Sequence, residues 1–441
     1  MISDLAFARS QMALSLAFHI VFAAVGVGMP LLMAVAEGMH LRTREPVYLD
    51  LARRWANGTA LLFAVGAVSG TVLSFELGLL WPGFMAFAGG IIGLPFALEG
   101  FAFFAEAIFL GIYLYGWDRV PAVAHWLAGI AVAVCGMLSA VFVVTVNAWM
   151  NTPTGFEMAG GRIVRIDALA AMTNPASLNQ AVHMVLAAYV ATAFVVAGVH
   201  AFFLLRHRHD AFHRRAFGIA LAVAAVSVPL QAASGDALAR MVAIRQPAKL
   251  AAMEGHYRTE AGAPLVIGGI PDDAARTTRY AIRIPRGLSL LAHHDPRAVV
   301  RGLDSIPRDE WPNTRIVHWA FDVMAGAGGV MLAVAGWAGW LWWRRRRVPD
   351  DPWLLRAVVV TGPLGLVAIE AGWIVTEVGR QPWIIHGVMR TSEAVTPMPG
   401  LVVPFVTFTL VYVFLSVILL YLLRRQFLAT DPVRQSAGHG Q

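Results

Sequence analysis

The chain has 441 residues, of which 58% are hydrophobic and only 14% are charged, and its formal net charge is +7. A soluble domain carries nearer a quarter charged residues, so this composition excludes an ordinary soluble protein and indicates a membrane protein. The basic excess is almost entirely arginine placed between hydrophobic stretches, where the positive-inside rule accounts for it, so we expect no nucleic-acid partner.

Nine apolar stretches are long enough to cross a bilayer, which requires about 20 predominantly apolar residues. The first is too long for the core of a signal peptide and has no basic segment before it, so we interpret it as a retained span. The predicted fold class is an all-α integral membrane protein with one long extracytoplasmic loop. The stretches are residues 11–36, 58–82, 91–116, 121–148, 176–205, 216–238, 316–343, 353–377 and 400–423.

Cys135, the only cysteine, lies in the fourth of these stretches. A lone thiol excludes an intrachain disulfide, a CxxC redox motif and a cysteine-ligated iron–sulfur cluster. We interpret it as a small core residue.

The arginine clusters predict the orientation. They follow the first, fifth, seventh and ninth stretches, whereas the short alternate loops contain few arginines. Odd-numbered spans are therefore expected to end in the cytoplasm, with the N-terminus outside and the C-terminus inside. The clusters are Arg42, Arg44, Arg53 and Arg54; Arg206, Arg208, Arg214 and Arg215; Arg344 to Arg347; and Arg424 with Arg425.

One polar segment interrupts the series of spans. Residues 239–315 are rich in charges, proline and glycine, and a segment of this length is either functional or disordered. The predicted organisation is thus spans one to six in residues 1–238, an extracytoplasmic loop in 239–315, and spans seven to nine with a cytoplasmic tail in 316–441.

A histidine and a methionine lie at matched depth in two spans. His183 and Met324 are each about eight residues into a stretch that starts outside, which places both about 12 Å below the outer boundary. Such a pair can ligate one low-spin haem. Alternatively, a methionine in a span fills the core, and a membrane histidine hydrogen-bonds to a neighbouring helix.

Three further groups predict a second metal site near the same level. His19 lies about eight residues into the first span, and Glu377 and Glu99 lie near the outer ends of the eighth and third spans. A carboxylate suits an iron with an open coordination position. The alternative is that Glu377 pairs with Arg380 at a helix terminus.

Glu99 and Glu106 indicate a proton relay, because residues seven apart share one face of a helix to within about 20°. Asp118 ends the same helix at the cytoplasmic side, but it lies about 120° round from Glu106. Water or a neighbouring helix would have to bridge that step. The alternative is that these carboxylates pair with partners elsewhere in the bundle.

Seven local strings, in order along the chain, resemble subunit I of the cytochrome bd-type quinol oxidases, particularly its short-loop, cyanide-insensitive class. The most specific are the GRQPW segment and the helices carrying the candidate haem ligands. The strings are RSQMALSLAFH (9–19), EGFAFFAE (99–106), GWDR (116–119), NAWMNTP (147–153), KLAAME (249–254), GIPD (269–272) and EAGWIVTEVGRQPW (370–383).

The resemblance implies a role for each candidate residue. His183 and Met324 would ligate the low-spin b haem, and His19 and Glu377 would ligate a high-spin b haem and the oxygen-reducing haem d, which a b haem replaces in some members. Trp373 and Arg380 would contact the cofactors. The catalytic carboxylates would be Glu99, Glu106 and Asp118, and the residues for quinol would be Lys249 and Glu254.

The implied activity is electrogenic quinol:oxygen oxidoreduction in the bacterial inner membrane. Ubiquinol or menaquinol would be oxidised near the outer face, and oxygen would be reduced to water with cytoplasmic protons, without a pumping cycle. The implied partners are a second membrane subunit, with room for a small single-span subunit as well. The resemblance leaves open which quinone is used and which haem fills the oxygen site.

Three departures from the family pattern stand out. Glu99 and Glu106 are one residue closer than in long-loop members, the outer loop is short, and Asp322 stands where some members carry arginine. The role of Asp322 stays open, and Arg315 is a candidate to neutralise the haem propionates. Two alternative functions are a haem-free proton-coupled transporter and a multihaem b-type electron-transfer subunit that does not reduce oxygen.

Overall fold

The computed structural model describes residues 3–429, and within this range it contains nine helical spans that are long and apolar enough to cross a membrane. The predicted fold class is confirmed. The predicted cytoplasmic tail from residue 430 onward lies outside the described residues. The spans are α1 (Asp4–Thr43), α2 (Pro46–Leu80), α3 (Pro82–Tyr115), α4 (Ala122–Asn151), α6 (Ser177–Arg206), α7 (Ala211–Arg245), α10 (Thr314–Arg345), α11 (Pro352–Thr361) continued by α12 (Leu364–Val378), and α14 (Val402–Ala429).

The helices begin where the sequence offers capping groups. The side chains of Ser3, Asp210, Asn313 and Asp351 accept hydrogen bonds from backbone N–H groups in the first turns of α1, α7, α10 and α11. Several helices extend beyond their apolar stretches, since a polar residue does not end a helix that remains capped and hydrogen-bonded. The helix α3, for instance, starts nine residues before its predicted span.

The eighth span is broken into α11 and α12 at Gly362 and Pro363. Proline lacks the backbone N–H that a continuous helix would use there. The break lies against α6, where a Cβ on Gly198 would come within 3.1 Å of the Gly362 Cα. Small residues of this kind allow close helix approach in membranes.

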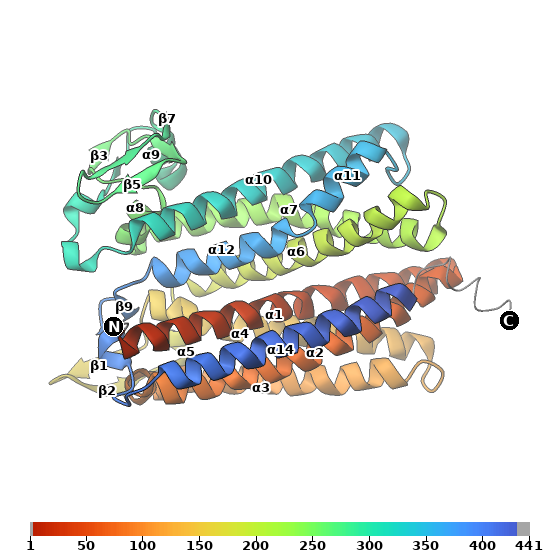
Figure 1. Ribbon diagram of the computed structural model, residues 1–441, viewed down its shortest axis with the longest axis horizontal. Coiled ribbons are helices and arrows are strands. Elements are labelled where there is room, and N and C mark those ends of the chain that lie inside the picture. The colour runs from red at the N-terminus through yellow and green to blue at the C-terminus, as the bar shows by residue number, and fades with distance from the viewer. Residues whose placement is uncertain (1–2, 430–441) are drawn as a thin grey trace.

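Eight of the nine spans in residues 3–429 form two four-helix groups (Figure 1). In the first group, α1, α2, α3 and α4 contact one another in a ring, and in the second α6, α7, α10 and α12 do the same. Contacts of α6 with α1 and α4 join the two groups, and α14 lies outside the first group against α1. In each ring, helices that are not neighbours lie diagonally opposite.

One end of the bundle, which we call the loop end, carries the segment between α7 and α10 (Figure 1). The segment is folded into short helices and antiparallel strand pairs. It contains α8 (Pro247–Met253), β3 (Glu260–Ala261) paired with β8 (Val299–Val300), β4 (Leu265–Ile267) with β7 (Ile282–Ile284), β5 (Ile270–Asp272) with β6 (Thr277–Arg279), α9 (Gly287–His293), η1 (Leu303–Ser305) and η2 (Arg308–Glu310).

Smaller elements complete the loop end. They are β1 (Phe156–Ala159) paired with β2 (Arg162–Ile166), α5 (Ala168–Met172), β9 (Trp383–Ile385) paired with β10 (Met389–Arg390), and α13 (Thr391–Ala394). We call the opposite end, which carries Arg344 to Arg347, the arginine-rich end.

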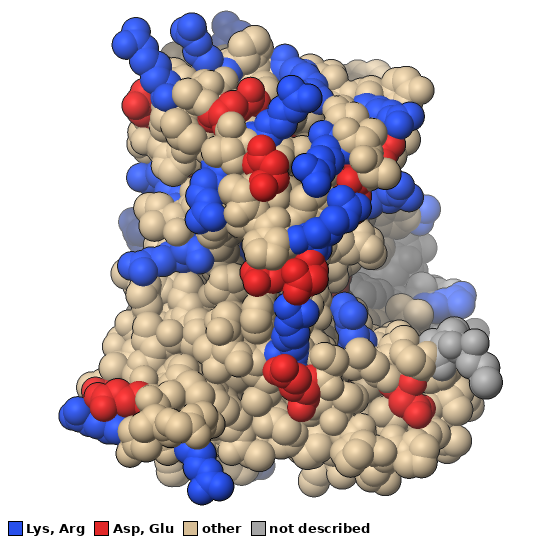
Figure 2. All heavy atoms as spheres, turned by 90° about the vertical axis from the view of Figure 1, so that its left-hand side faces the viewer, with Lys and Arg blue, Asp and Glu red and all other residues tan. Residues whose placement is uncertain are grey.

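Charge is distributed unevenly over the loop end. Figure 2 shows this end of the molecule, where most lysine and arginine side chains gather over the half formed by residues 246–313. The flanks of the bundle are apolar, and only 11% of the most apolar window of α2 or α14 is buried within the chain. These flanks suit contact with lipid or with another membrane subunit.

Candidate functional site

His183 and Met324 lie on diagonally opposite helices of the second ring, α6 and α10. They are six and ten residues from the starts of their helices. Met324 faces α12, where a Cβ on Gly372 would come within 3.1 Å of the Met324 sulfur. Helices that lie diagonally opposite in a ring can present ligands to one haem in the space between them.

Hydrogen bonding fixes the tautomer of His183. Its Nδ1 lies 3.0 Å from the Ser234 hydroxyl oxygen, and that hydroxyl donates its own proton to the Gln231 carbonyl at 2.9 Å. The Ser234 oxygen must therefore accept from His183 Nδ1–H, which leaves Nε2 with the free lone pair that an iron ligand needs. The Gln231 amide lies 3.1 Å from Nε2, so it would turn aside when Nε2 binds iron.

His19 is held by the same arrangement in the first ring. Its Nδ1 lies 3.0 Å from the Ser69 hydroxyl oxygen on α2, and that hydroxyl donates to the Val65 carbonyl at 2.9 Å. In both sites the serine is followed by a glycine against the imidazole, Gly70 beside His19 and Gly235 beside His183. A Ser-Gly dipeptide therefore contacts each of the two histidines. This dipeptide is visible in the sequence, but the sequence analysis did not identify it.

Glu377, at the loop end of α12, is bound by two groups. The Asn147 amide donates to one carboxylate oxygen, and Arg380 donates to the other at 2.6 Å. The pairing with Arg380, considered above as the alternative to metal ligation, is thus present. Arg380 is only 4% exposed, and its Nε and Nη1 have no hydrogen-bond partner among the described residues. A buried cation with free donors fits an anionic group such as a haem propionate.

Trp373 belongs to an apolar cluster between the two rings. The cluster joins α1, α6 and α12 and includes neighbours in sequence of both histidines, Ile20 and Met184. An apolar wall of this kind suits the faces of haem groups that lie close together.

The donor groups suit haem better than a bare metal ion. The described part of the chain contains no group of three or more His, Cys, Asp and Glu side chains that could hold an ion. A haem supplies four nitrogen ligands of its own, so one or two axial side chains suffice. With two histidines whose Nε2 atoms carry the lone pair, a methionine sulfur and an unsatisfied buried arginine, the residues fit haem.

The carboxylates of α3 face α4. The Ser139 hydroxyl donates to Glu99 at 3.3 Å, and a Cβ on Gly136 would come within 3.0 Å of a Glu106 oxygen. Glu106 is buried, with 6% of its surface exposed. Asp118 is not part of this arrangement, since its side chain is 88% exposed and contacts Arg53 at 3.4 Å.

The two residues predicted for quinol are both buried within the folded loop segment, in α8 and at its end. Lys249 Nζ donates to the side-chain oxygen Oδ1 of Asn151 at 2.5 Å, and the aliphatic part of Lys249 packs against Gly379, next to Arg380. Burial, together with the charge of Arg380, lowers the pKa of Lys249 to about 7, while Glu377 acts in the opposite direction.

Glu254 lies at the end of α8 and is 4% exposed. Burial, with the negative charge of Asp322, raises the pKa of Glu254 to about 8. Its Oε2 has no hydrogen-bond partner among residues 3–429. Glu254 can therefore exchange a proton near neutral pH.

Asp322 ties α10 to the loop segment, which the sequence did not predict. Its carboxylate accepts from the Gly268 N–H at 2.9 Å and lies 3.4 Å from His318 Nε2. The same histidine lies 2.7 Å from the Met253 carbonyl through Nδ1 and 3.0 Å from the Gly268 carbonyl through Nε2. The spacing of four between His318 and Asp322, on one helix face, was the available signal.

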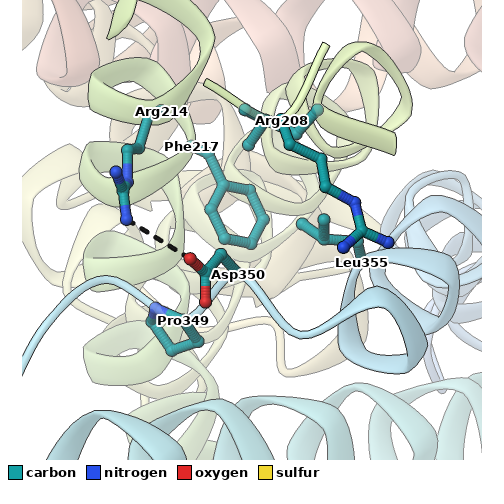
Figure 3. A pocket seen from close by; sticks show the side chains of 7 residues that line it. Arg208, Arg214, Phe217, Pro349, Asp350 and Leu355 are labelled. Carbon is teal, nitrogen blue, oxygen red and sulfur yellow. Dashed lines mark hydrogen bonds and ion pairs between the residues drawn. The ribbon is translucent and has the colours of Figure 1, made fainter. Parts of the chain in front are cut away.

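A small pocket at the arginine-rich end is lined by Arg208, Arg214 and Asp350, with an ion pair of 3.3 Å between the last two (Figure 3). Leu204, in its wall, is about 30 Å along α6 from His183 at 1.5 Å per residue. The pocket is thus remote from the candidate haem site.

Comparisons with known proteins point to one family. Residues 7–430 match the family model for cytochrome bd terminal oxidase subunit I. The chain is 39% identical to the putative cytochrome bd menaquinol oxidase subunit I of Bacillus subtilis, over 96% of each chain. It is 32% identical to the cytochrome bd ubiquinol oxidase subunit 1 of the same organism, over 99% of each chain.

Two further matches extend the comparison. The chain is 29% identical to the cytochrome bd-II ubiquinol oxidase subunit 1 of Escherichia coli, over 88% of each chain. Its fold matches a chain from the structure of bd oxidase from Geobacillus thermodenitrificans with a TM-score of 0.90 and 40% identity, covering 97% of this chain and 99% of that one.

Proposed function

The chain belongs to the cytochrome bd terminal oxidase subunit I family, and from that premise we propose that it oxidises quinol at its loop end and takes up protons for oxygen reduction from its arginine-rich end. As a member of this family it is the haem-bearing, multi-pass membrane subunit of a bacterial terminal quinol oxidase, and it works with a second subunit. The observation that carries the proposal is the diagonal placement of His183 and Met324 beneath the loop segment that buries Lys249 and Glu254.

We assign the haem ligands as follows. His183 and Met324 would hold a low-spin b haem through Nε2 and the thioether sulfur, with Ser234 keeping the imidazole in the required tautomer. His19 and Glu377 would hold the other two haems, a high-spin b haem and either haem d or a further b haem. Arg380 and Trp373 would contact these groups. When bound, the haems supply the electron transfer from quinol to oxygen and the reduction of oxygen.

Quinol docks under the folded loop segment. Glu254, as a carboxylate with a pKa of about 8, accepts a proton from the quinol hydroxyl, and Lys249 binds the quinol oxygen from the other side. The matching relatives are named for menaquinol in one case and for ubiquinol in others, so either quinone class is a candidate substrate.

The protons for oxygen reduction pass along the face of α3 that carries Glu106 and Glu99. The arginine-rich end lies on the cytoplasmic side of the bacterial inner membrane, and the N-terminus and the loop segment lie on the outer side. Protons then cross much of the membrane in one direction, which generates a membrane potential without a pumping cycle. Asp118, exposed at the arginine-rich end, collects protons from solvent. The second subunit, and a small single-span subunit where one is present, cover the apolar flanks.

The ligand assignment is tested by the reduced-minus-oxidised absorption spectrum of the purified complex. His183→Ala and Met324→Leu should each abolish the low-spin b band and leave carbon monoxide binding at the other haems. Met331→Leu is the matched control, since Met331 is buried seven residues further along α10 and should leave the spectrum unchanged. An unchanged low-spin band in both ligand variants would exclude this pair.

A further inference from the structure

The carboxylate face of α3 continues beyond Glu106 to a tyrosine. Glu106 follows Glu99 by seven residues, and Tyr113 follows Glu106 by seven. All three therefore share one face of the helix, with successive residues about 10.5 Å apart along its axis. Tyr113 is fully buried near the arginine-rich end of α3. Its ring lies over Gly129 of α4, where a Cβ would come within 2.6 Å of it. The face thus reaches the end of the helix through Tyr113, whereas Asp118 points into solvent.

At that point Tyr113 meets a buried acid–base pair. Glu37 of α1 and His125 of α4 are joined by a contact of 2.7 Å between Oε1 and Nδ1, and their side chains are 4% and 2% exposed. The ring centroids of Tyr113 and His125 are 4.5 Å apart, and the two rings are tilted by 31°. The Tyr113 hydroxyl and the Oε2 atom of Glu37 are both buried, and neither has a hydrogen-bond partner among residues 3–429, so each can still accept or donate a proton. Three helices, α1, α3 and α4, therefore each contribute one proton-active side chain to this cluster.

The geometry requires the pair to hold a proton. His125 Nε2 lies 2.9 Å from the Tyr113 backbone carbonyl, which is only an acceptor, so Nε2 carries a hydrogen. Without a further proton, the lone pair of Nδ1 would face a carboxylate at 2.7 Å. One proton must lie between Nδ1 and Oε1, either as an imidazolium–carboxylate pair or as a carboxylic acid donating to a neutral imidazole.

The pair is also close to the surface without being open to it. Trp117 covers the imidazole on another side at 4.1 Å, and the Arg53 guanidinium lies over the Trp117 ring at 5.1 Å. Arg53 in turn contacts Asp118 at 3.4 Å. Asp118, exposed, and the Glu37–His125 pair, buried, therefore lie on opposite sides of one thin layer formed by Arg53 and Trp117.

We propose that the Glu37–His125 pair is the proton-loading site at the arginine-rich end of the α3 face, and that it delivers protons to Glu106 by way of Tyr113. The pair gives up the proton between Nδ1 and Oε1, the Tyr113 hydroxyl passes a proton on as it receives one, and the pair is reprotonated from the aqueous side. No electron changes place in this step. The proposal rests on the function proposed above, because it assumes that protons enter from this end.

The alternative is a structural pair that only fastens α1 to α4. Glu37→Gln and Tyr113→Phe separate the two roles, since each keeps the shape of the side chain and removes its exchangeable proton. Glu45→Gln is the matched control, because Glu45 lies at the same end in an exposed ion pair with Arg215. Glu37→Asp keeps a carboxyl group and should restore most of the rate that Glu37→Gln loses.

The experiment uses the complete oxidase, with its partner subunit, reconstituted into vesicles. Oxygen reduction is started by photolysis of the carbon monoxide adduct, and proton uptake is followed with a pH-sensitive dye beside the membrane potential. Glu37→Gln and Tyr113→Phe should slow both signals by at least about tenfold. Haem content, thermal stability and the reduction of the low-spin haem by quinol should equal those of the Glu45→Gln control.

The outcomes that contradict the proposal are distinct from those that contradict the proposed function. Normal proton uptake in Glu37→Gln and Tyr113→Phe, with slow uptake in Glu106→Gln, would overturn the loading site and leave the α3 route intact. Normal uptake in Glu106→Gln as well would overturn the route itself. Loss of haem or of thermal stability in step with the rate, without rescue by Glu37→Asp, would assign the pair a structural role and overturn its role in proton loading.

Discussion

Glu254 connects the burial of a single carboxyl group to the pH dependence of the reaction. Its pKa is raised to about 8, so below that pH the folded protein holds it protonated, and above it the carboxylate is available to accept a proton. Between pH 7 and pH 9 the ionised fraction of such a group rises from about a tenth to about nine-tenths. The rate of quinol oxidation should therefore rise with pH through about 8.

Measurement of low-spin haem reduction by quinol across this pH range tests the role of Glu254. Glu254→Gln should lower the rate at least about tenfold and remove its rise with pH. Glu260→Gln, an exposed position in the same loop segment, is the matched control and should retain the wild-type profile. A profile in Glu254→Gln that still rises through pH 8 would assign the titration to a different group.

At the residue scale, the sequence predicted which ionisable residues belong to the candidate site better than it predicted the side chains that hydrogen-bond to them. His19, His183, Glu99 and Glu106 were singled out because ionisable groups in apolar stretches are costly. The groups that orient them could not be predicted in the same way. Ser69, Ser234, Asn147 and Asn151 are ordinary polar residues in a helix, and only the three-dimensional arrangement shows that they hold a histidine, a glutamate or the sole lysine.

At the scale of the helices, α7 determines how α6 presents its histidine. The Ser234 oxygen accepts the His183 Nδ1–H, which raises the basicity of the imidazole as an iron ligand. Ser234→Ala removes this acceptor. The ferric state should lose about 1 kcal/mol of stabilisation, which corresponds to a rise of about 40 mV in the reduction potential of the low-spin haem.

A redox titration of the low-spin band measures this shift. Ser227→Ala is the control, because Ser227 is buried two turns earlier on α7 and should leave the potential unchanged. An equal potential in Ser234→Ala and wild type would show that the hydrogen bond does not tune the haem. Ser69→Ala should act in the same way on the haem ligated by His19, since the two cradles are alike.

Helix number and approximate position were predictable because about 20 apolar residues are needed to cross a bilayer. Helix ends were less predictable. The cap at Asp210 and the proline at the start of α3 extend those helices beyond the hydrocarbon pattern, and the break at Pro363 lies inside a continuous apolar stretch. Hydropathy reports the solvent around a helix, whereas caps and proline determine where its hydrogen bonds stop.

For the whole molecule, the sequence predicted nine spans but not their arrangement into two rings. Which helices lie diagonally opposite depends on side-chain packing between segments far apart in the chain, and short loops are compatible with several arrangements. The diagonal placement of His183 and Met324 therefore required the structure. The division of the chain at residues 238 and 315 stays a prediction, although α7 continues to Arg245 and α10 begins at Thr314.

Orientation in the membrane decides whether the reaction generates a potential, and the single cysteine makes it simple to measure. In a Cys135→Ala background, one new cysteine is placed at each end: Tyr280→Cys in the loop segment, where the side chain is 89% exposed, and Arg346→Cys at the arginine-rich end, also exposed. The arginine clusters predict that a membrane-impermeant maleimide labels the first in intact spheroplasts.

The Arg346→Cys variant should react with the maleimide only after the membrane is permeabilised. Both variants should retain the haem spectrum, because neither position contacts a predicted ligand. If the labelling is reversed, quinol protons would be released and oxygen protons taken up on opposite sides from those proposed, so the potential generated by turnover would have the opposite sign. Measuring that potential in the same membranes gives an independent check, since both readouts must agree on which end of the bundle faces the cytoplasm.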